Sequence, residues 1–335
     1  MQLTELKTPY LIFLGSETDE TYAKTGAGVA HWSPEKCMGQ FHLEGGTVDL
    51  GLPEHTIESA ASSGAKTLLI GTALVGGGIP ESWSKVLIEA MEHGMDIVAG
   101  VHTRLNEIPE LKQAAEANQV SLIDVRVPPK NLPVGNGKKR TGKRLLTVGT
   151  DCALGKKYTA LAIAQELKTQ GRKATFRASG QTGIMISGSG IPIDAVVADF
   201  ISGAAETLSP ENEPDHWDII EGQGSIYHPG YAAVSMGLLM GSQPDAFVVC
   251  HQAGRTHIAG WPEFELPTIR DVIERTIEIG KQTNGAIHCV GLSINTSKLS
   301  EHEAKDFLES LENVFGLPAT DPIRFGVEKI VKALS

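Results

Sequence analysis

The chain contains little cysteine, and its cysteines are scattered. Four occur in 335 residues and none forms a CxxC pair; they are Cys37, Cys152, Cys250 and Cys289. This spacing excludes a disulfide framework and a zinc-ribbon site, and it is typical of a protein in a reducing cytoplasm. A long apolar run at the start is also missing, because only residues 10–14 are continuously apolar there. We therefore expect neither a secretory signal nor a membrane span.

An excess of positive charge is missing as well. Lysine and arginine number 29 against 40 aspartates and glutamates, so the formal net charge is −11. This balance argues against a protein that binds nucleic acid or an anionic membrane, because such partners require a basic face. It is compatible with small-molecule substrates, including a small anion held in a local pocket.

The length is typical of about two domains. In the first third, short apolar runs alternate with segments of helical periodicity. The expected strands are 10–15, 67–73, 96–100 and 121–125, and the expected helices are 54–63, 81–93 and 107–118. Strands that alternate with helices predict a parallel sheet covered on both faces.

Residues 127–144 interrupt this pattern with three prolines, three glycines and six basic residues, which is typical of an exposed connector. A second alternating series follows. Its expected strands are 144–150, 174–179, 194–199, 218–222, 246–251 and 288–295, and its expected helices are 156–170, 229–241, 267–282, 300–313 and 322–334. We therefore predict an α/β protein with a Rossmann-like domain over 1–135 and a second α/β domain over 136–335.

The stretch "LLTVGTDCALGKKYTAL", residues 145–161, carries the strongest functional pattern. An apolar strand ends at Gly149, and a helix is expected from Lys156. Unpaired N–H groups and the helix dipole attract an anion at such a junction, the glycines let the chain wrap around it, and the lysine adds a charge. The predicted phosphate-binding residues are Gly149, Thr150, Asp151, Cys152, Ala153, Leu154, Gly155, Lys156, Lys157 and Tyr158. The other interpretation is an ordinary strand–turn–helix connection.

Two details distinguish this loop from the usual phosphate-binding loop. Five residues instead of four separate Gly149 from Gly155, which is the GTDxxxGK form of P-loop proteins that resemble dethiobiotin synthetase. Lys157 stands where a serine or threonine usually ligates Mg²⁺. Because a protonated lysine cannot ligate a metal, we expect a site that holds a polyanion without hydrolysing it. The second domain is thus predicted to be P-loop NTPase-like.

Three carboxylates are candidates for a general base. Glu221 follows an apolar strand in "DIIEGQG", and the glutamate at this place points at the nucleotide in dethiobiotin-synthetase-like proteins. The other interpretation is a surface glutamate in a glycine turn. Asp194 and Asp199 bracket the predicted strand "DAVVAD", and for Asp199 a helix-capping role is an equal alternative.

Other polar side chains follow predicted strands, at the edge where α/β sheets bind ligands. The predicted substrate-binding residues among them are Gln181, Thr182, Gln223, Ser225, Arg255, Arg177 and Arg104. The arginines could bind substrate carboxylates through paired hydrogen bonds. For the loops around Lys24 and Arg104, a purely solvated role is an equal alternative. Cys250, His251 and His257 show no metal-binding spacing, and no metal site is predicted.

Together these motifs resemble the bacterial D-glutamate N-acetyltransferase family, a P-loop family long described only as a domain of unknown function. The resemblance covers nearly the whole chain. It rests on "GVHTRL", "GKRLLTVGTDCALGKKYTAL", "FRASGQTGIMISGSGIPIDAVVADFISGAAE", "DHWDIIEGQGSIYHPGY", "QPDAFVVCHQAGR" and "LPATDPIRFG". It implies a role in D-amino-acid metabolism, in which acetyl-CoA acetylates the amine of D-glutamate to give N-acetyl-D-glutamate.

Under this resemblance, the loop holds the phosphates of acetyl-CoA and one of the three carboxylates deprotonates the amine. Gln181, Gln223, Ser225 or glycine N–H groups would donate to the thioester oxygen. Two alternatives stay open: an ATP- and Mg²⁺-dependent kinase or ligase like dethiobiotin synthetase, which Lys157 disfavours, and a nucleotide sensor without enzymatic activity. The sequence leaves a Mg²⁺ requirement undecided, and we expect a cytoplasmic homodimer.

Overall fold

A computed structural model describes residues 4–72 and 78–334; the last residue of the predicted strand 67–73 lies outside them. Contacts divide the chain into two compact units. Of the described residues, the C-terminal unit comprises Lys130–Gly180 and 193–334, and the N-terminal unit comprises those up to Pro129 together with Gln181–Pro192. The change of unit after Pro129 lies within the predicted connector and near the predicted division between residues 135 and 136.

The segment Gln181–Pro192, which the sequence placed in the second domain, packs with the N-terminal unit. It contains helix α6 (Gln181–Ser187), where no helix was predicted from the sequence. The Ser33 hydroxyl donates a hydrogen bond to the Ile186 carbonyl at 2.8 Å. The segment also adds one strand to an antiparallel ribbon made of β9 (Ser189–Gly190) and β1 (Thr4–Glu5). These contacts join residues far apart in the sequence, so no local pattern predicts them.

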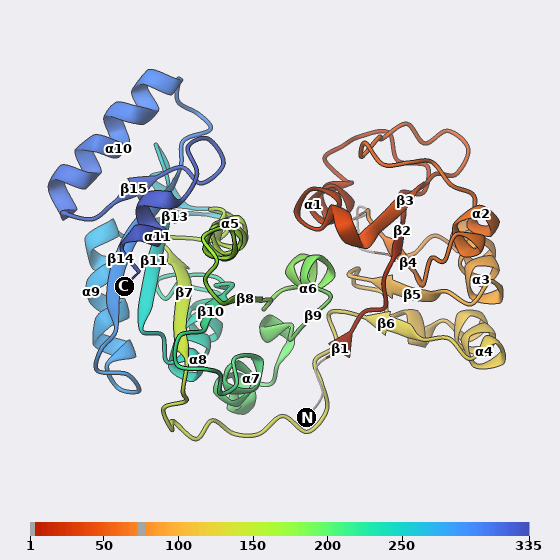
Figure 1. The fold of residues 1–335 in the computed structure, drawn as a ribbon, viewed down its shortest axis with the longest axis horizontal. Coiled ribbons are helices and arrows are strands. Elements are labelled where there is room, and N and C mark those ends of the chain that lie inside the picture. Colours follow the sequence, from red (N-terminus) through yellow and green to blue (C-terminus); the bar gives the residue numbers. More distant parts are fainter. Residues whose placement is uncertain (1–3, 73–77, 335) are drawn as a thin grey trace. The chain divides into compact units, whose positions relative to one another are not determined.

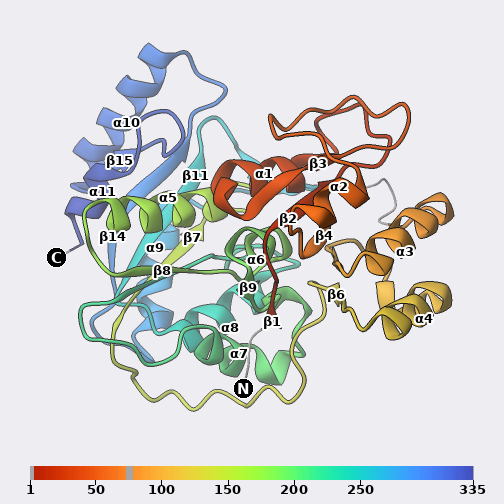
Figure 2. The same cartoon turned by 45° about the vertical axis from the view of Figure 1, so that its right-hand side comes forward.

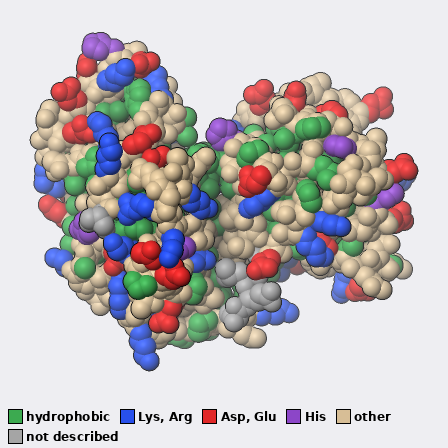
Figure 3. Space-filling model, viewed as in Figure 1, with side chains coloured by type: hydrophobic (Ala, Val, Ile, Leu, Met, Phe, Trp, Pro, Cys, Tyr) green, Lys and Arg blue, Asp and Glu red, His purple; other side chains and the backbone are tan. Residues whose placement is uncertain are grey.

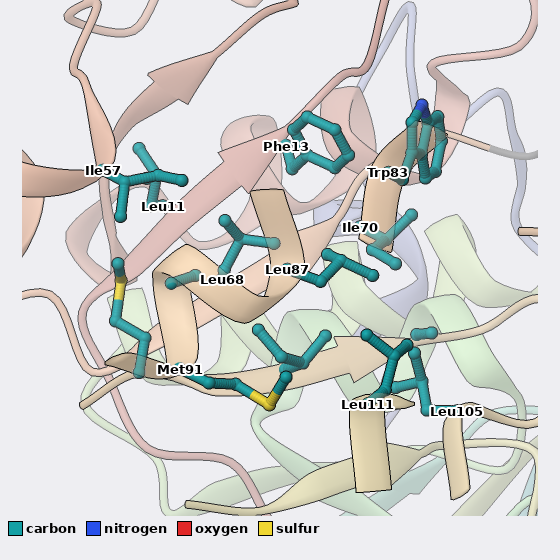
Figure 4. Packing of buried hydrophobic residues seen from close by; sticks show 14 of the residues in the cluster. Leu11, Phe13, Ile57, Leu68, Ile70, Trp83, Leu87, Met91, Leu105 and Leu111 are labelled. Atoms are coloured by element: carbon teal, nitrogen blue, oxygen red, sulfur yellow. The ribbon is translucent and has the colours of Figure 1, made fainter. Parts of the chain in front are cut away.

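The N-terminal unit contains a five-stranded parallel sheet in the order β3-β2-β4-β5-β6 (Figure 1). Its strands are β2 (Tyr10–Phe13), β3 (Cys37–Phe41), β4 (Thr67–Ile70), β5 (Asp96–Ala99) and β6 (Leu122–Asp124). Its other helices are α1 (Lys24–Trp32), α2 (Ile57–Ser62), α3 (Ser84–Glu92) and α4 (Pro109–Asn118). A core that includes Leu11, Phe13, Leu68, Leu87 and Met91 joins the sheet to α2, α3 and α4 (Figure 4). The predicted Rossmann-like sheet is confirmed.

Helix α1 stands where a loop was expected over 21–32. Its two glycines disfavour a helix by intrinsic propensity, but Gly26 allows α1 to approach the sheet closely. A Cβ atom at this position would lie 3.1 Å from the Ile12 side chain and 3.3 Å from the Cα atom of Gly71. Strand β3 was not predicted either, because its sequence CMGQF has few of the β-branched residues that favour strands.

The C-terminal unit contains a six-stranded parallel sheet in the order β15-β14-β11-β7-β10-β8. Its strands are β7 (Lys143–Gly149), β8 (Ala174–Arg177), β10 (Trp217–Ile220), β11 (Ala246–Gln252), β14 (His288–Asn295) and β15 (Ala319–Thr320). Its helices are α5 (Lys156–Thr169), α7 (Ile201–Leu208), α8 (Ala232–Ser242), α9 (Ile269–Gly280), α10 (Glu301–Phe315) and α11 (Glu328–Lys332). Helices α5 and α11 pack together on one face, and α8 and α9 pack on the other (Figures 1 and 2).

Most predicted elements are confirmed to within three residues at either end. The strand predicted over 194–199 is wrong: this segment forms two 3₁₀ turns, and its apolar run is only partly buried, since Val196 is buried but Val197 is 67% exposed. The helix predicted over 322–334 is limited to α11. The Asp321 carboxylate accepts the N–H groups of Ile323 and Arg324 and holds them in a turn. The prediction also lacks α7 and a hairpin of two strands, β12 (His257–Ile258) and β13 (Trp261–Glu265).

Acidic and basic side chains are interspersed over the face of the described residues that Figure 3 shows. Among the described residues, no helix has both the length and the apolar character needed to cross a membrane.

Candidate functional site

The loop between β7 and α5 has the geometry of an anion-binding turn. Strand β7 ends at Gly149, and α5 begins at Lys156 and continues for 14 residues. Gly155 caps the helix with φ +98°, in the left-handed region that favours glycine. The helix therefore starts with its unpaired N–H groups at the carboxyl edge of the sheet, where they and the helix dipole attract negative charge.

Lys156 is buried within this loop. Its side chain is 7% exposed, and its Nζ donates a hydrogen bond to the Asp151 carbonyl oxygen at 2.7 Å. Burial lowers the pKa of Lys156, because desolvation disfavours the charged ammonium. An anion bound at the loop would add a counter-charge beside the buried ammonium and would oppose this lowering of the pKa.

The Asp151 side chain ties the loop to the β12–β13 hairpin. Its Oδ1 accepts the Cys152 N–H at 2.6 Å, while its Oδ2 accepts Arg255 Nη1 at 2.9 Å and the Ala259 N–H at 2.8 Å. Arg255 Nη1 also donates to the Cys152 carbonyl at 2.9 Å. The structure thus gives Arg255 a positioning role at the loop; its predicted contact with a substrate carboxylate stays a prediction.

Asp151, Cys152 and His228 lie close enough together to suggest a metal site, but their hydrogen bonds do not fit one. Nδ1 of His228 accepts the Gly230 N–H at 3.0 Å, so Nε2 carries the proton and has no lone pair for a metal. Both oxygens of Asp151 already accept hydrogen bonds. Cysteine and histidine are also poor ligands for Mg²⁺, which prefers oxygen.

Glu221 is the buried carboxylate of the site. It follows β10, is 5% exposed, and its Oε2 accepts the N–H groups of Ser179 at 2.9 Å and Gly180 at 3.1 Å. Burial raises the pKa of Glu221 to about 7, although Lys157 and the two hydrogen bonds act in the opposite direction. A carboxyl group with a pKa near neutrality can exchange a proton with a substrate at physiological pH.

Lys157, in the first turn of α5, interacts electrostatically with Glu221. Its Nζ stands over the Tyr158 ring, 4.7 Å from the ring centroid. Burial lowers the pKa of Lys157, and the nearby Glu221 carboxylate opposes that shift. The next serine or threonine along the helix, Thr159, is buried, and its hydroxyl contacts Ser293 Oγ at 2.7 Å.

Gln223 extends the hydrogen bonds around Glu221. Its Nε2 donates to Ser179 Oγ at 2.9 Å, and the Ser179 hydroxyl donates to the Glu221 carbonyl at 2.6 Å. Ser225 is buried and accepts the Tyr227 N–H at 3.2 Å, which closes the turn after the glutamate. Ser179 was not among the predicted site residues; its place as the last residue of the predicted strand 174–179 was the available signal.

Gly222 holds Glu221 close to the loop because it has no side chain. A Cβ atom there would lie 1.6 Å from the Thr147 carbonyl oxygen of β7. We expect Gly222→Ala to lower the free energy of unfolding by about 1–3 kcal/mol or more and to displace Glu221, with a corresponding loss of activity. Thermal unfolding and turnover should be compared with Gly285→Ala, where no atom lies within 4 Å of the new Cβ. Equal melting temperatures for the two variants would contradict the close approach.

The remaining predicted residues are placed elsewhere. Asp194 and Asp199 are exposed, although Asp194 contributes to raising the pKa of Glu221. Arg177 pairs with the buried Asp218 at 2.9 Å. Three further residues belong to the N-terminal unit; they are Arg104, Gln181 and Thr182. Roles for these residues with the substrate stay predictions.

A parallel sheet, a glycine-capped loop and a lysine at the start of the following helix define a P-loop protein. The neighbouring carboxylate is buried, and a lysine stands at the position of the usual metal-ligating hydroxyl.

Comparisons with known proteins agree with this class and identify the family. A model described as the DUF1611_N Rossmann-like domain of unknown function matches residues 41–128, and one described as the DUF1611_C P-loop domain matches 133–331. Curated relatives named D-glutamate N-acetyltransferase, from Tritonibacter scottomollicae and a Pseudoalteromonas species, are each 47% identical over 98% of this chain and 99% of their own. A crystal structure of a DUF1611 family protein from Anabaena variabilis is 34% identical, covers 98% of this chain and 99% of that one, and has a TM-score of 0.83. The chain belongs to this family, as its sequence motifs indicate.

Proposed function

We propose that the protein is an N-acetyltransferase that moves the acetyl group of acetyl-CoA to the amine of D-glutamate. The names of the two curated relatives support the reaction and the amino acid. The observation in this chain that carries the proposal is Glu221, a buried carboxyl group with a pKa of about 7 beside the phosphate-binding loop. Such a group suits the deprotonation of an amine.

In the proposed reaction, Glu221 accepts a proton from the ammonium group of D-glutamate. The neutral amine then attacks the carbonyl carbon of the thioester. A C–N bond forms and the C–S bond breaks, so that CoA leaves as a thiolate that takes up a proton. The overall reaction releases one proton to solvent. Backbone N–H groups and the amide of Gln223 are donors on the Glu221 side of the loop that could stabilise the developing oxyanion.

The loop has a binding role in this proposal. The N–H groups at the start of α5, together with Lys156 and Lys157, would hold the diphosphate of acetyl-CoA. Lys157 supports binding without hydrolysis, because it adds a cation where P-loop nucleotidases place the hydroxyl that ligates Mg²⁺. The same feature disfavours the ATP-dependent kinase or ligase.

Release of free thiol tests the function. Purified protein with acetyl-CoA and D-glutamate should liberate CoA, and L-glutamate serves as the stereochemical control. The expected result is thiol release with the D isomer that exceeds the rate with the L isomer and persists in EDTA. Phosphate release from ATP without thiol release from acetyl-CoA would favour the kinase or ligase and contradict the proposal.

A further inference from the structure

A cavity of about 470 Å³ adjoins the phosphate-binding loop within the C-terminal unit. Its walls come from the loop and the start of α5, from the carboxyl end of β14, and from the turn that follows β15. The residues used below are Leu154, Tyr158, Asn295, Ser297, Ile323 and Arg324. The volume falls within the range of about 300–1,000 Å³ that is usual for small-molecule sites.

We propose that this cavity binds the adenosine end of CoA, and that Arg324 binds the 3′-phosphate that distinguishes CoA from other adenine nucleotides. The inference rests on the proposed function for the identity of the ligand. It adds a binding site and a specificity-determining residue away from the reacting groups.

The cavity has the composition that a purine nucleoside requires. Leu154 and Tyr158 provide apolar and aromatic surface on the loop side, and Ile323, which is 66% exposed, provides it on the opposite turn. A base between these side chains would bury Ile323 from water, which is favourable for an exposed apolar residue. Asn295 and Ser297 place polar groups at the wall, where they can bond to the edge of a base or to a ribose hydroxyl.

Arg324 is held in a fixed orientation that leaves part of its guanidinium available. Nη1 donates to the carbonyl oxygens of Thr296 and Leu299, both at 3.1 Å. Among the described residues, no hydrogen bond engages its Nε or Nη2. A guanidinium anchored through one nitrogen can present the others to a phosphate with little further loss of entropy.

The acidic residue in the cavity wall does not oppose an anion strongly, because its charge is already engaged. Oδ2 of Asp321 accepts the Thr296 N–H at 2.9 Å and the Thr296 hydroxyl at 2.7 Å, and Oδ1 accepts two N–H groups of the following turn. Through these hydrogen bonds, Asp321 fixes the conformation of the turn that carries Arg324.

The order of the strands indicates which end of CoA would lie on each side of the loop. The cavity lies at β14, the loop follows β7, and Glu221 follows β10. Since the order is β14-β11-β7-β10, the nucleoside and the carboxylate lie on opposite sides of the loop, about 15 Å apart across three strand spacings. A diphosphate at the loop would thus separate an adenosine on the β14 side from an acyl-bearing arm on the Glu221 side.

Calorimetric binding of CoA and dephospho-CoA tests the inference, because the two ligands differ only in the 3′-phosphate and neither requires acetyl transfer. We expect the protein to bind CoA roughly tenfold more tightly, as for one charge-assisted hydrogen bond, and Arg324→Met to abolish that preference. The control Arg275→Met removes an exposed arginine of α9 that pairs with Glu278 and should keep the preference.

A second variant tests the cavity independently of the arginine. Ser297 is exposed at the cavity wall, so Ser297→Trp should be tolerated by the fold and should weaken both ligands by about tenfold or more. Equal affinity of the unmodified protein for CoA and dephospho-CoA would overturn the inference, as would a full preference in Arg324→Met or unchanged binding in Ser297→Trp. Each of these outcomes is compatible with acetyl transfer in the thiol assay, so failure of this inference is distinguishable from failure of the proposed function.

Discussion

Replacing Glu221 by glutamine is expected to lower kcat at least about a hundredfold, since positioned general bases contribute about 10²–10⁴. The glutamine oxygen can still accept the N–H groups of Ser179 and Gly180 that the glutamate accepts, so the fold should persist. What is lost is the ability to take a proton from the ammonium of the substrate. Thiol release at saturating concentrations of both substrates measures the effect.

Asp199→Asn is the matched control for this variant. Asp199 was also predicted as a catalytic carboxylate, but it is exposed, whereas Glu221 is buried. We expect Asp199→Asn to keep kcat within about threefold, because Asp199 is exposed on a 3₁₀ turn and is not among the hydrogen-bond partners of Glu221. A large loss in Asp199→Asn with little loss in Glu221→Gln would reverse the assignment of the base.

The pH dependence follows from the same group. Because the pKa of Glu221 in the free protein is about 7, kcat/KM should rise with pH through neutrality and then level. The raised pKa means that the folded state holds the proton more tightly than the unfolded state, so the contribution of Glu221 to stability falls as the pH rises from about 4.5 to about 7. Glu221→Gln removes this decline and should melt roughly 5 °C higher than the unmodified protein at pH 8. An equal increase in the melting temperature of Glu221→Gln at pH 4 would contradict the raised pKa of Glu221.

Lys156→Met is expected to weaken the binding of CoA about a hundredfold, which corresponds to the loss of charge-assisted hydrogen bonds to a phosphate. The substitution also removes a buried ammonium whose pKa is already lowered by desolvation, and methionine fills most of the same volume. The fold should therefore be retained or gain stability. Calorimetry with CoA measures the loss directly.

The control for this variant is Lys168→Met, which removes an exposed lysine from the last turn of the same helix and should leave CoA binding unchanged. The KM for D-glutamate should change little in Lys156→Met if the loop holds only the carrier. Unchanged CoA affinity in Lys156→Met would show that the diphosphate is bound elsewhere.

The parts of the fold that local patterns determine could be predicted from the sequence. The strand before Gly149, the helix from Lys156 and the strand before Glu221 all have periodicity or apolar runs that are visible within a few residues. Helix α1 could not be predicted in the same way, because its glycines are favourable only once Gly26 meets Gly71. The apolar run at 194–199 led to a wrong strand prediction, because nothing in the local sequence shows that Val197 stays exposed.

The candidate site shows the same limit. The sequence pointed to the loop and included Glu221 among three carboxylates, with Asp194 ranked third, but it could not assign the base to one of them. Glu221 differs from the two aspartates because it is buried, and burial raises its pKa. The N–H groups of Ser179 and Gly180 donate to its carboxylate and moderate that rise. Likewise, the pairing of Arg255 with Asp151 joins residues 104 positions apart. Such long-range contacts have no local signature.

A crystal structure of the protein with CoA tests the central claim most directly, namely that the loop anchors the diphosphate of an acyl carrier and does not cleave a nucleotide. We expect the diphosphate to lie against the N–H groups at the start of α5 and beside Lys156, with the thiol end on the Glu221 side. A complex in which CoA is bound while the diphosphate lies away from this loop would contradict the claim.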